Sequence, residues 1–202
     1  MALPLQPSLT PWATWQRRLL AIGTCLIGIT LLGLLGQPAA RPPQLLLSAA
    51  DSDRSYAREV ERLINTSNQR VWVMVYVLYP GDEADHPVNA LCAALAKARE
   101  RGVDARVVID IGREWGTEDI SDKHQQGESL LRELGVPILL DEVDRTSHSK
   151  IVLIDDRIAV IGSHNWTRSA LMSNRETSLL VDDPKIVREL EQQFTSVAGW
   201  AP

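Results

Sequence analysis

A histidine and a lysine separated by one residue stand at the start of an apolar stretch in the last third of the chain. They are His148 and Lys150, and Ile151 to Ile154 follow them. Side chains two positions apart on a strand point to the same face, about 7 Å from each other, so one phosphate group could contact both. An imidazole can attack phosphorus or donate a proton, and an ammonium group stabilises the charge of the transition state. The pair therefore predicts phosphoryl chemistry.

Further polar residues follow this strand and can be placed by assuming a tight hairpin. Residues 155–157 read Asp-Asp-Arg and separate two apolar stretches. If the last two of these residues form the turn, Lys150 falls opposite Ser163. The same register puts His148 opposite Asn165. The sequence thus predicts four polar side chains on one face of a hairpin, where Ser163 and Asn165 donate to phosphate oxygens. The alternative interpretation is an exposed polar strand end.

The carboxylate of Asp155 has a different expected role. It stands at the turn, where an aspartate can accept hydrogen bonds from local backbone amides. We therefore interpret Asp155 as a structural residue that holds the hairpin.

These residues form a pattern that resembles a known family. The pattern H-x-K-x4-D at His148, Lys150 and Asp155 is followed by G-S-x-N at 162–165, and together they resemble the HKD motif of the phospholipase D superfamily. The likeness covers roughly residues 44 to 200 and is greatest to short members with one motif per chain. Those members include bacterial endonucleases and a membrane-anchored mitochondrial form. The resemblance implies a phosphohistidine intermediate, with a second His from another motif as proton donor.

The resemblance also implies roles for residues outside the central pair. Glu176, eleven residues after Asn165, would orient the catalytic imidazole, and its alternative is a solvent-exposed strand residue. Gly162 belongs to the structural part of the motif. Weaker candidates for substrate contact are Arg145, Arg168, Arg175, Trp166 and Trp115. Either tryptophan could instead pack against the core.

No cofactor and no metal site are expected. The cysteines, Cys25 and Cys92, are far apart, which excludes a Cys/His zinc cluster. The acidic residues of one loop, residues 114–122, lack the spacing and glycine of an EF-hand. A phosphodiesterase that uses histidine and lysine has no need of a cation at the reacting phosphate.

The elements that must position these residues form an α/β pattern, in which apolar runs alternate with amphipathic stretches. We predict a mixed central β-sheet flanked by helices. The expected strands are Gln44 to Leu47, Val71 to Tyr79, Ala105 to Ile111, Pro137 to Leu140, Ser149 to Ile154, Ile158 to Gly162 and Thr177 to Val181. The expected helices are Asp53 to Asn65, one from Pro87 to before Gly102, one before Gly135, and Pro184 to Ser196.

An apolar segment precedes this domain. Residues 19–36 are eighteen residues without a charge, which span about 27 Å as a helix and match the core of a bilayer. We predict a membrane anchor, with a cleaved signal as the alternative. The basic residues 17–18 favour a cytoplasmic tail, 1–18, and an extracytoplasmic catalytic domain, periplasmic or secreted if the segment is cleaved. Residues 37–43 form a linker to the domain at 44–202.

Charge and histidine count limit the function and the assembly. Residues 44–202 carry a net charge of -8, which opposes non-specific nucleic-acid binding, whereas residues 145–176 carry +2. By the resemblance, nucleic acid is the leading substrate and a phospholipid headgroup ester the second. A catalytically silent dimeric adaptor is the third interpretation. Because His86, His124 and His164 are not followed two residues later by Lys, one chain has one motif, and we predict a homodimer.

Overall fold

The computed structural model divides the chain into two units, Met1–Ala40 and Arg41–Pro202. The structure describes residues 41–48, 54–83, 85–110, 118–141, 146–197 and 199–200. In the helix that begins at Glu118, it describes side chains only from His124 onward. The predicted tail and membrane segment, most of the linker, Trp115 and Arg145 lie outside these residues. Within the described ranges, no helix is both long enough and apolar enough to cross a membrane.

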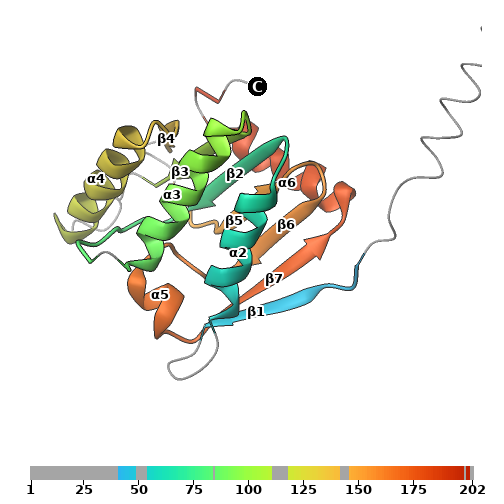
Figure 1. Cartoon of the computed structure of the whole chain (residues 1–202), viewed down its shortest axis with the longest axis horizontal. Helices are drawn as coiled ribbons and strands as arrows, with labels where there is room; N and C mark the ends of the chain where they lie inside the picture. The colour runs from blue at the N-terminus through green and yellow to red at the C-terminus, as the bar shows by residue number, and fades with distance from the viewer. Residues whose placement is uncertain are drawn as a thin grey trace, which may run out of the picture. The chain divides into compact units, whose positions relative to one another are not determined.

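One seven-stranded mixed sheet forms the centre of the second unit, as predicted (Figure 1). Its strand order is β1-β7-β6-β5-β2-β3-β4, in which β2, β3 and β4 are parallel and the remaining pairs are antiparallel. The strands are β1 (Gln44–Ser48), β2 (Arg70–Val75), β3 (Asp104–Ile109), β4 (Ile138–Leu140), β5 (Ile151–Ile154), β6 (Ile158–Gly162) and β7 (Glu176–Asp182).

Helices cover both faces of the sheet. Their bounds are α2 (Ser55–Thr66), α3 (Pro87–Glu100), α4 (Glu118–Glu133), α5 (Arg168–Met172) and α6 (Pro184–Thr195). Buried residues of α2, α3, α4 and α5 join one apolar core, and those of α6 join a second core on the other face. The sequence predicted four of these helices. The fifth, α5, has five residues and is too short to show a helical period.

The central strands are apolar on both faces because each face meets helices. In β2, Val71, Val73 and Val75 enter the core under α2 and α3. Trp72 and Met74 alternate with them and enter the core under α6. This burial explains why the predicted strands are continuous apolar runs.

The β5–β6 hairpin differs from the prediction by one residue. Ile154 pairs with Ile158, so three residues form the turn instead of two. Asp155 begins this turn with a φ of 51°. Lys150 consequently lies across from Gly162, whose N–H donates to the Lys150 carbonyl (3.2 Å). The predicted register, with Lys150 opposite Ser163, is wrong.

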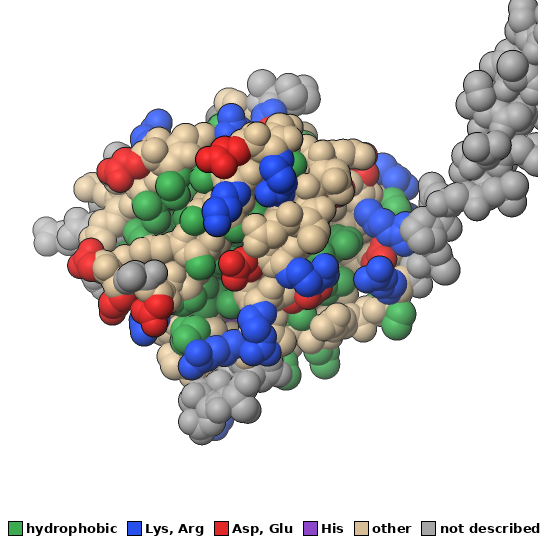
Figure 2. Space-filling model, in the orientation of Figure 1, with side chains coloured by type: hydrophobic (Ala, Val, Ile, Leu, Met, Phe, Trp, Pro, Cys, Tyr) green, Lys and Arg blue, Asp and Glu red, His purple; other side chains and the backbone are tan. Residues whose placement is uncertain are grey.

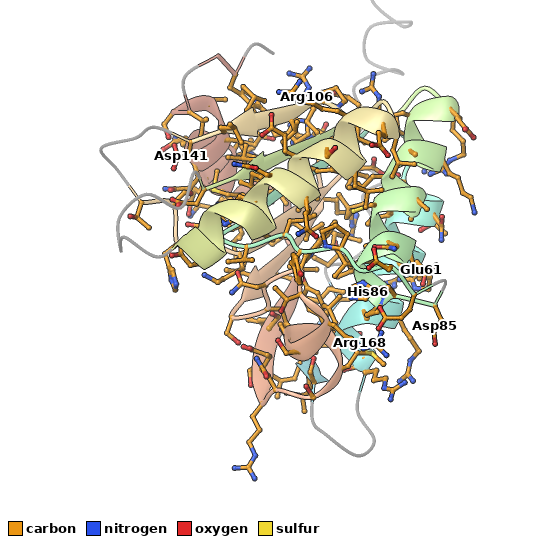
Figure 3. The ribbon with its side chains drawn as sticks, turned by 90° about the vertical axis from the view of Figure 1, so that its left-hand side faces the viewer. Glu61, Asp85, His86, Arg106, Asp141 and Arg168 are labelled. Carbon is orange, nitrogen blue, oxygen red and sulfur yellow. The ribbon has the colours of Figure 1, made fainter. Side chains whose placement is uncertain are left out.

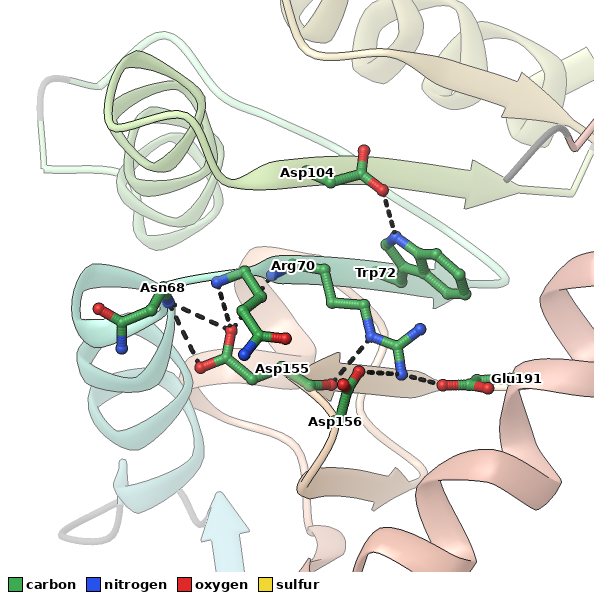
Figure 4. Close-up of polar contacts among 8 residues, drawn as sticks. Asn68, Arg70, Trp72, Asp104, Asp155, Asp156 and Glu191 are labelled. Carbon is green, nitrogen blue, oxygen red and sulfur yellow. Dashed lines mark hydrogen bonds and ion pairs between the residues drawn. The ribbon is translucent and has the colours of Figure 1, made fainter. Parts of the chain in front are cut away.

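The partners of Asp155 explain the different turn (Figure 4). Its carboxylate accepts hydrogen bonds from the backbone N–H groups of Asn68 (3.1 Å), Gln69 (2.8 Å) and Arg70 (3.1 Å). These amides belong to the loop between α2 and β2 and to the first residue of β2, more than eighty residues away in sequence. Asp155 therefore has structural contacts, but it ties the hairpin to a distant loop rather than to local amides.

We expect Asp155→Ala to lower the free energy of unfolding by about 2 to 3 kcal/mol, because three amides lose a charged acceptor and alanine disfavours a positive φ. Asp155→Asn should cost less, because its amide oxygen still accepts. Asp156→Ala is the matched control: it removes only the ion pair between the exposed Asp156 carboxylate and Arg70, which keeps its pair with Glu191, and should cost under about 1 kcal/mol. Denaturant unfolding measures each value. Equal losses in the two alanine variants would contradict the assignment.

Candidate active site

The polar residues predicted to act in chemistry lie at one edge of the sheet. Strands β2, β3 and β6 run in one direction and end there, whereas β5 and β7 run oppositely and begin there. His148 and Lys150 directly precede β5. Ser163 follows β6, and Glu176 begins β7. The topology thus brings both parts of the motif to the same edge.

His148 and Lys150 gather around the ring of Tyr76, the residue after β2. The imidazole of His148 lies 4.6 Å from this ring, centroid to centroid, and the Lys150 ammonium lies 5.1 Å from its centroid. Lys150 also donates to the backbone carbonyl of His148 (2.6 Å). The lysine is 8% exposed, whereas His148 is open to solvent. An exposed imidazole therefore sits beside a held cation, an arrangement that suits attack on a phosphate anion.

A buried carboxylate that the sequence analysis did not single out completes this group. Asp110 follows β3, is 4% exposed, and accepts a hydrogen bond from the Ser147 N–H (2.8 Å). Its negative charge opposes the lowering of the pKa values of both His148 and Lys150. Asp110 therefore fixes the loop that carries His148 and Lys150 and compensates part of the Lys150 charge. The sequence signal for Asp110 is an acidic residue near the end of the apolar run that begins at Ala105.

Burial and charge shift the pKa values of the pair in the same direction. Partial desolvation of the exposed His148 ring lowers its pKa below the ordinary 6.5, and the Lys150 charge lowers it further. The imidazole is consequently neutral, as a nucleophile must be, at neutral pH. Burial also lowers the pKa of Lys150 to about 8, against the opposing effects of Glu176 and Asp110. Lys150 thus carries its charge at neutral pH and loses it in mild alkali.

We expect kcat/KM for phosphodiester hydrolysis to fall as pH rises through about 8, because the free enzyme then loses the Lys150 charge. It should also fall in acid, where His148 becomes protonated. The check is a pH–rate profile of the wild type beside Lys150→Arg, whose guanidinium stays charged. The alkaline decrease should disappear in this variant, whatever its absolute rate. An unchanged alkaline limb would assign that decrease to another group.

Ser163 and Glu176 form a second polar pair at this edge. The Ser163 hydroxyl donates to the Glu176 carboxylate and accepts from the Thr177 N–H (3.1 Å). Asn174 also donates to Glu176 (3.1 Å). Among the contacts of the described residues, none joins Glu176 to the His148 imidazole. Its charge raises the pKa of Lys150, so the two polar pairs are electrostatically linked.

Asn165 lines a pocket beside the motif. Its side-chain oxygen accepts from the Val77 N–H (3.2 Å), which fixes it against the end of β2. The pocket measures about 590 Å³ and is lined by Val77, Tyr79, Asn165, Thr167, Arg168, Ser169, Met172 and Ser173. Arg168 lies 3.8 Å from the Glu83 carboxylate, and Figure 3 shows it on the same side as His86 and Asp85. The pocket offers apolar walls, hydroxyl groups and one cation.

One of the weaker site predictions, Trp166, and the position of one charge counted in residues 145–176 need correction. Trp166 is 0% exposed, donates to the Tyr56 hydroxyl (3.3 Å) and packs in the core, so it cannot stack on a substrate. Arg157, counted in the basic segment, binds Asp182 beside the hairpin turn, at the end of β6 away from the site. Asp155 and Asp156 stand in the same turn, so all three charges of residues 155–157 lie away from the site. Arg175 is exposed one residue before β7.

The other motif residues hold the strands behind the site. A Cβ atom at Gly162 would come within 2.1 Å of the Ser178 hydroxyl, so only glycine fits there. His164 is fully buried and hydrogen-bonds Ser48 (2.8 Å) and Ser178 (2.8 Å). Burial lowers the pKa of His164 to about 4, so it stays neutral and links β1 to β7.

Metal ligands do not cluster in this part of the chain. Among the described residues, no three His, Cys, Asp or Glu side chains are placed to hold an ion.

Comparison with known proteins places this geometry in a family. A family model described as "Cardiolipin synthase, PLD-like domain" matches residues 60–198. The chain belongs to the phospholipase D superfamily. The resemblance found in the motif is thereby confirmed over more than half of the chain.

Curated relatives in this superfamily carry cardiolipin in their names. "Mitochondrial cardiolipin hydrolase" of Homo sapiens is 31% identical over 104 residues, 52% of this chain and 38% of that protein. The protein of the same name from Chlamydomonas reinhardtii is 31% identical over 96 residues, 46% of this chain and 39% of that protein. "Cardiolipin synthase B" of Salmonella typhi is 29% identical over 168 residues, 75% and 38% of the two chains. The chain spans less than half the length of these relatives.

Solved structures of the superfamily share the fold. A phospholipase D family member, Nuc from Salmonella typhimurium, has a TM-score of 0.61 and 20% identity over 77% of this chain and 94% of its own. NucT from Helicobacter pylori has a TM-score of 0.54 and 16% identity over the same shares, 77% and 94%. At these identities the likeness shows the fold alone.

Proposed function

We propose that this protein hydrolyses phosphodiester bonds through a covalent intermediate on His148. The observation that carries the proposal is the exposed His148 imidazole held beside the buried Lys150 ammonium and Asp110. A lowered pKa leaves the imidazole neutral, and Lys150 supplies charge where the phosphorane-like transition state becomes more negative.

The reaction then has two displacement steps. In the first, a ring nitrogen of the neutral His148 forms a bond to phosphorus, the bond to the leaving oxygen breaks, and a second imidazole, which must be in its protonated form, gives that oxygen a proton and becomes neutral. In the second, this imidazole takes a proton from water, whose oxygen bonds to phosphorus as the bond to His148 breaks. Lys150, Ser163 and Asn165 are proposed to bind the phosphate oxygens. No metal ion is needed in either step.

The second imidazole is proposed to come from another copy of the chain. The sequence holds one H-x-K pattern. His86 and His164 are buried at 3% and 0% exposure, so neither can reach a solvent-open phosphate. His124 is also buried, at 4%. An isologous two-fold contact would put both His148 side chains on one phosphate, so we propose a homodimer.

For the substrate we favour a phospholipid headgroup ester, which stood second on sequence grounds. The pocket beside Asn165 has apolar walls from Val77, Tyr79 and Met172, which suit the glycerol and acyl part of a lipid. Residues 44–202 carry -8, which repels a polyanion. The curated relatives named above are cardiolipin hydrolases and a cardiolipin synthase. A membrane anchor at 19–36 would hold the site near lipid.

Nucleic acid remains a second candidate substrate, because the motif resembles short members that include endonucleases. The pocket also offers Arg168 and hydroxyl groups, which could bind a sugar–phosphate backbone. On the face shown in Figure 2, however, basic and acidic side chains are interspersed, and no continuous basic track crosses it.

The deciding assay compares both substrates under chelation. Full-length protein in detergent is incubated in EDTA with cardiolipin-containing vesicles and, separately, with single-stranded DNA and RNA. We expect release of a lipid phosphate product, at least tenfold faster than strand cleavage, and no loss of activity in EDTA. Faster cleavage of the strands would reverse the substrate assignment. Activity restored only by Mg²⁺ or Zn²⁺ would overturn the mechanism, and inactivity on all substrates would favour a silent adaptor.

A further inference from the structure

A second pocket lies away from the catalytic edge. It measures about 690 Å³, and its polar lining consists of Arg99, Asp104, Arg106 and Arg132, beside the backbone from Gly135 to Leu139. The three arginines come from α3, β3 and α4. Asp104 begins β3, whereas Asp110, which lies beside the proposed catalytic residues, follows its other end, about 20 Å along the strand. We call these four residues and the adjoining backbone the arginine pocket.

The view in Figure 3 agrees with this separation. Arg106 lies near one end of the molecule, and Arg168, which lines the pocket beside Asn165, lies near the other. A ligand in the arginine pocket would therefore not compete with substrate at the catalytic edge.

The charge of the arginine pocket is opposite to that of its domain. Three guanidinium groups and one carboxylate line it, within residues of net charge -8. The carboxylate is engaged on both oxygens: Asp104 accepts from the Arg106 Nε (2.6 Å) and from the Trp72 indole N–H (3.0 Å). Asp104 consequently positions Arg106 and offers little repulsion to a bound anion. A local excess of positive charge remains.

The guanidinium groups are also held in place by their surroundings. The Arg106 guanidinium carbon lies 5.3 Å from the ring centroid of Trp200, at a distance typical of cation–π contact. Arg99 donates to the Ala105 carbonyl (3.2 Å). Arg132 pairs with Glu128 on its own helix at 2.7 Å, with 63% of its side chain exposed. Two positioned arginines and one more exposed arginine thus surround one cavity.

We propose that the arginine pocket binds a phosphate-bearing ligand of about nucleotide size. Guanidinium groups bind phosphate oxygens in pairs, and positioned arginines lose less side-chain freedom when they do so. A volume of 690 Å³ lies within the range of small-molecule sites and exceeds what a single phosphate needs. The phosphate can belong to a free nucleotide or to a nucleic-acid strand. The inference does not depend on the reaction at His148.

Calorimetric titration of the full-length protein in detergent tests the site, with AMP, inorganic phosphate and a short single-stranded oligonucleotide as probes. We expect saturable binding that weakens about tenfold or more in Arg99→Gln, Arg106→Gln and Arg132→Gln. Arg58→Gln, an exposed arginine on α2 outside the pocket, is the matched control and should bind as the wild type does. Binding should persist in His148→Ala, because the site is separate from the catalytic edge.

The probes distinguish the source of the phosphate. Tighter binding of AMP than of the oligonucleotide would indicate a free nucleotide, and the reverse order a strand; both support the site. Absence of saturable binding with every probe would overturn the proposal. So would binding that the three pocket variants leave unchanged. Thermal unfolding of each variant shows whether a loss comes from misfolding, and Arg132→Gln, which removes only an exposed pair, keeps the test valid if the others unfold.

Discussion

Phosphodiester hydrolysis should fall by about a thousandfold or more in His148→Ala, because alanine cannot form the bond to phosphorus. The fold should stay intact, since the His148 side chain is exposed and touches mainly the Tyr76 ring. Measuring kcat on the preferred substrate, beside thermal unfolding, checks both statements. His148→Asn should be equally inactive, because its amide keeps polarity without nucleophilicity.

The loss of kcat in a Lys150 variant can be compared with the loss in His148→Ala. Lys150→Ala should lose about a hundredfold or more in kcat through the lost charge at the transition state. Lys185→Ala, an exposed lysine on α6, is the matched control and should retain full activity. Activity of His148→Ala within tenfold of the wild type would exclude the covalent mechanism, whatever the result at Lys150.

The sequence predicted the layers of the fold because buried strands and helices show themselves as apolar runs and regularly spaced apolar residues. Strand β6 matches the predicted range at both ends, and β2 and β5 read as continuous apolar runs because helices cover both faces. Strand order carried no such signal. The pairing of β1 with β7 joins residues more than 120 positions apart, and no local pattern specifies it.

The site was predicted in its residue types and less well in its geometry. His148 and Lys150 do adjoin each other, but the hairpin register shifted because amides at residues 68–70 hold Asp155. Tyr76 and Asp110 were read as ordinary members of apolar strands. Their roles depend on β2 and β3 ending at the same edge as β5 begins, which is a property of the sheet rather than of any segment.

A mixed dimer provides the last test, because the proposed mechanism needs two imidazoles and one chain offers one exposed catalytic histidine. We expect a heterodimer of one wild-type and one His148→Ala subunit to be inactive. The remaining imidazole could form the phosphoryl bond, but no second imidazole would protonate the leaving oxygen. Differently tagged subunits can be co-expressed and the mixed species isolated in two affinity steps, with a differently tagged wild-type dimer as the control.

The quantity to measure is turnover per dimer. A symmetric site predicts a value near that of the double variant, whereas two independent sites predict half of the wild type. A substrate with a good leaving group tests the role of the second imidazole separately, because such a group departs without a proton. The mixed dimer should then regain a single burst of product, as one His148 becomes phosphorylated, without steady turnover. Half-maximal steady activity on the ordinary substrate, or full activity of a monomer at high dilution, would show that each chain works alone and that its proton donor lies elsewhere.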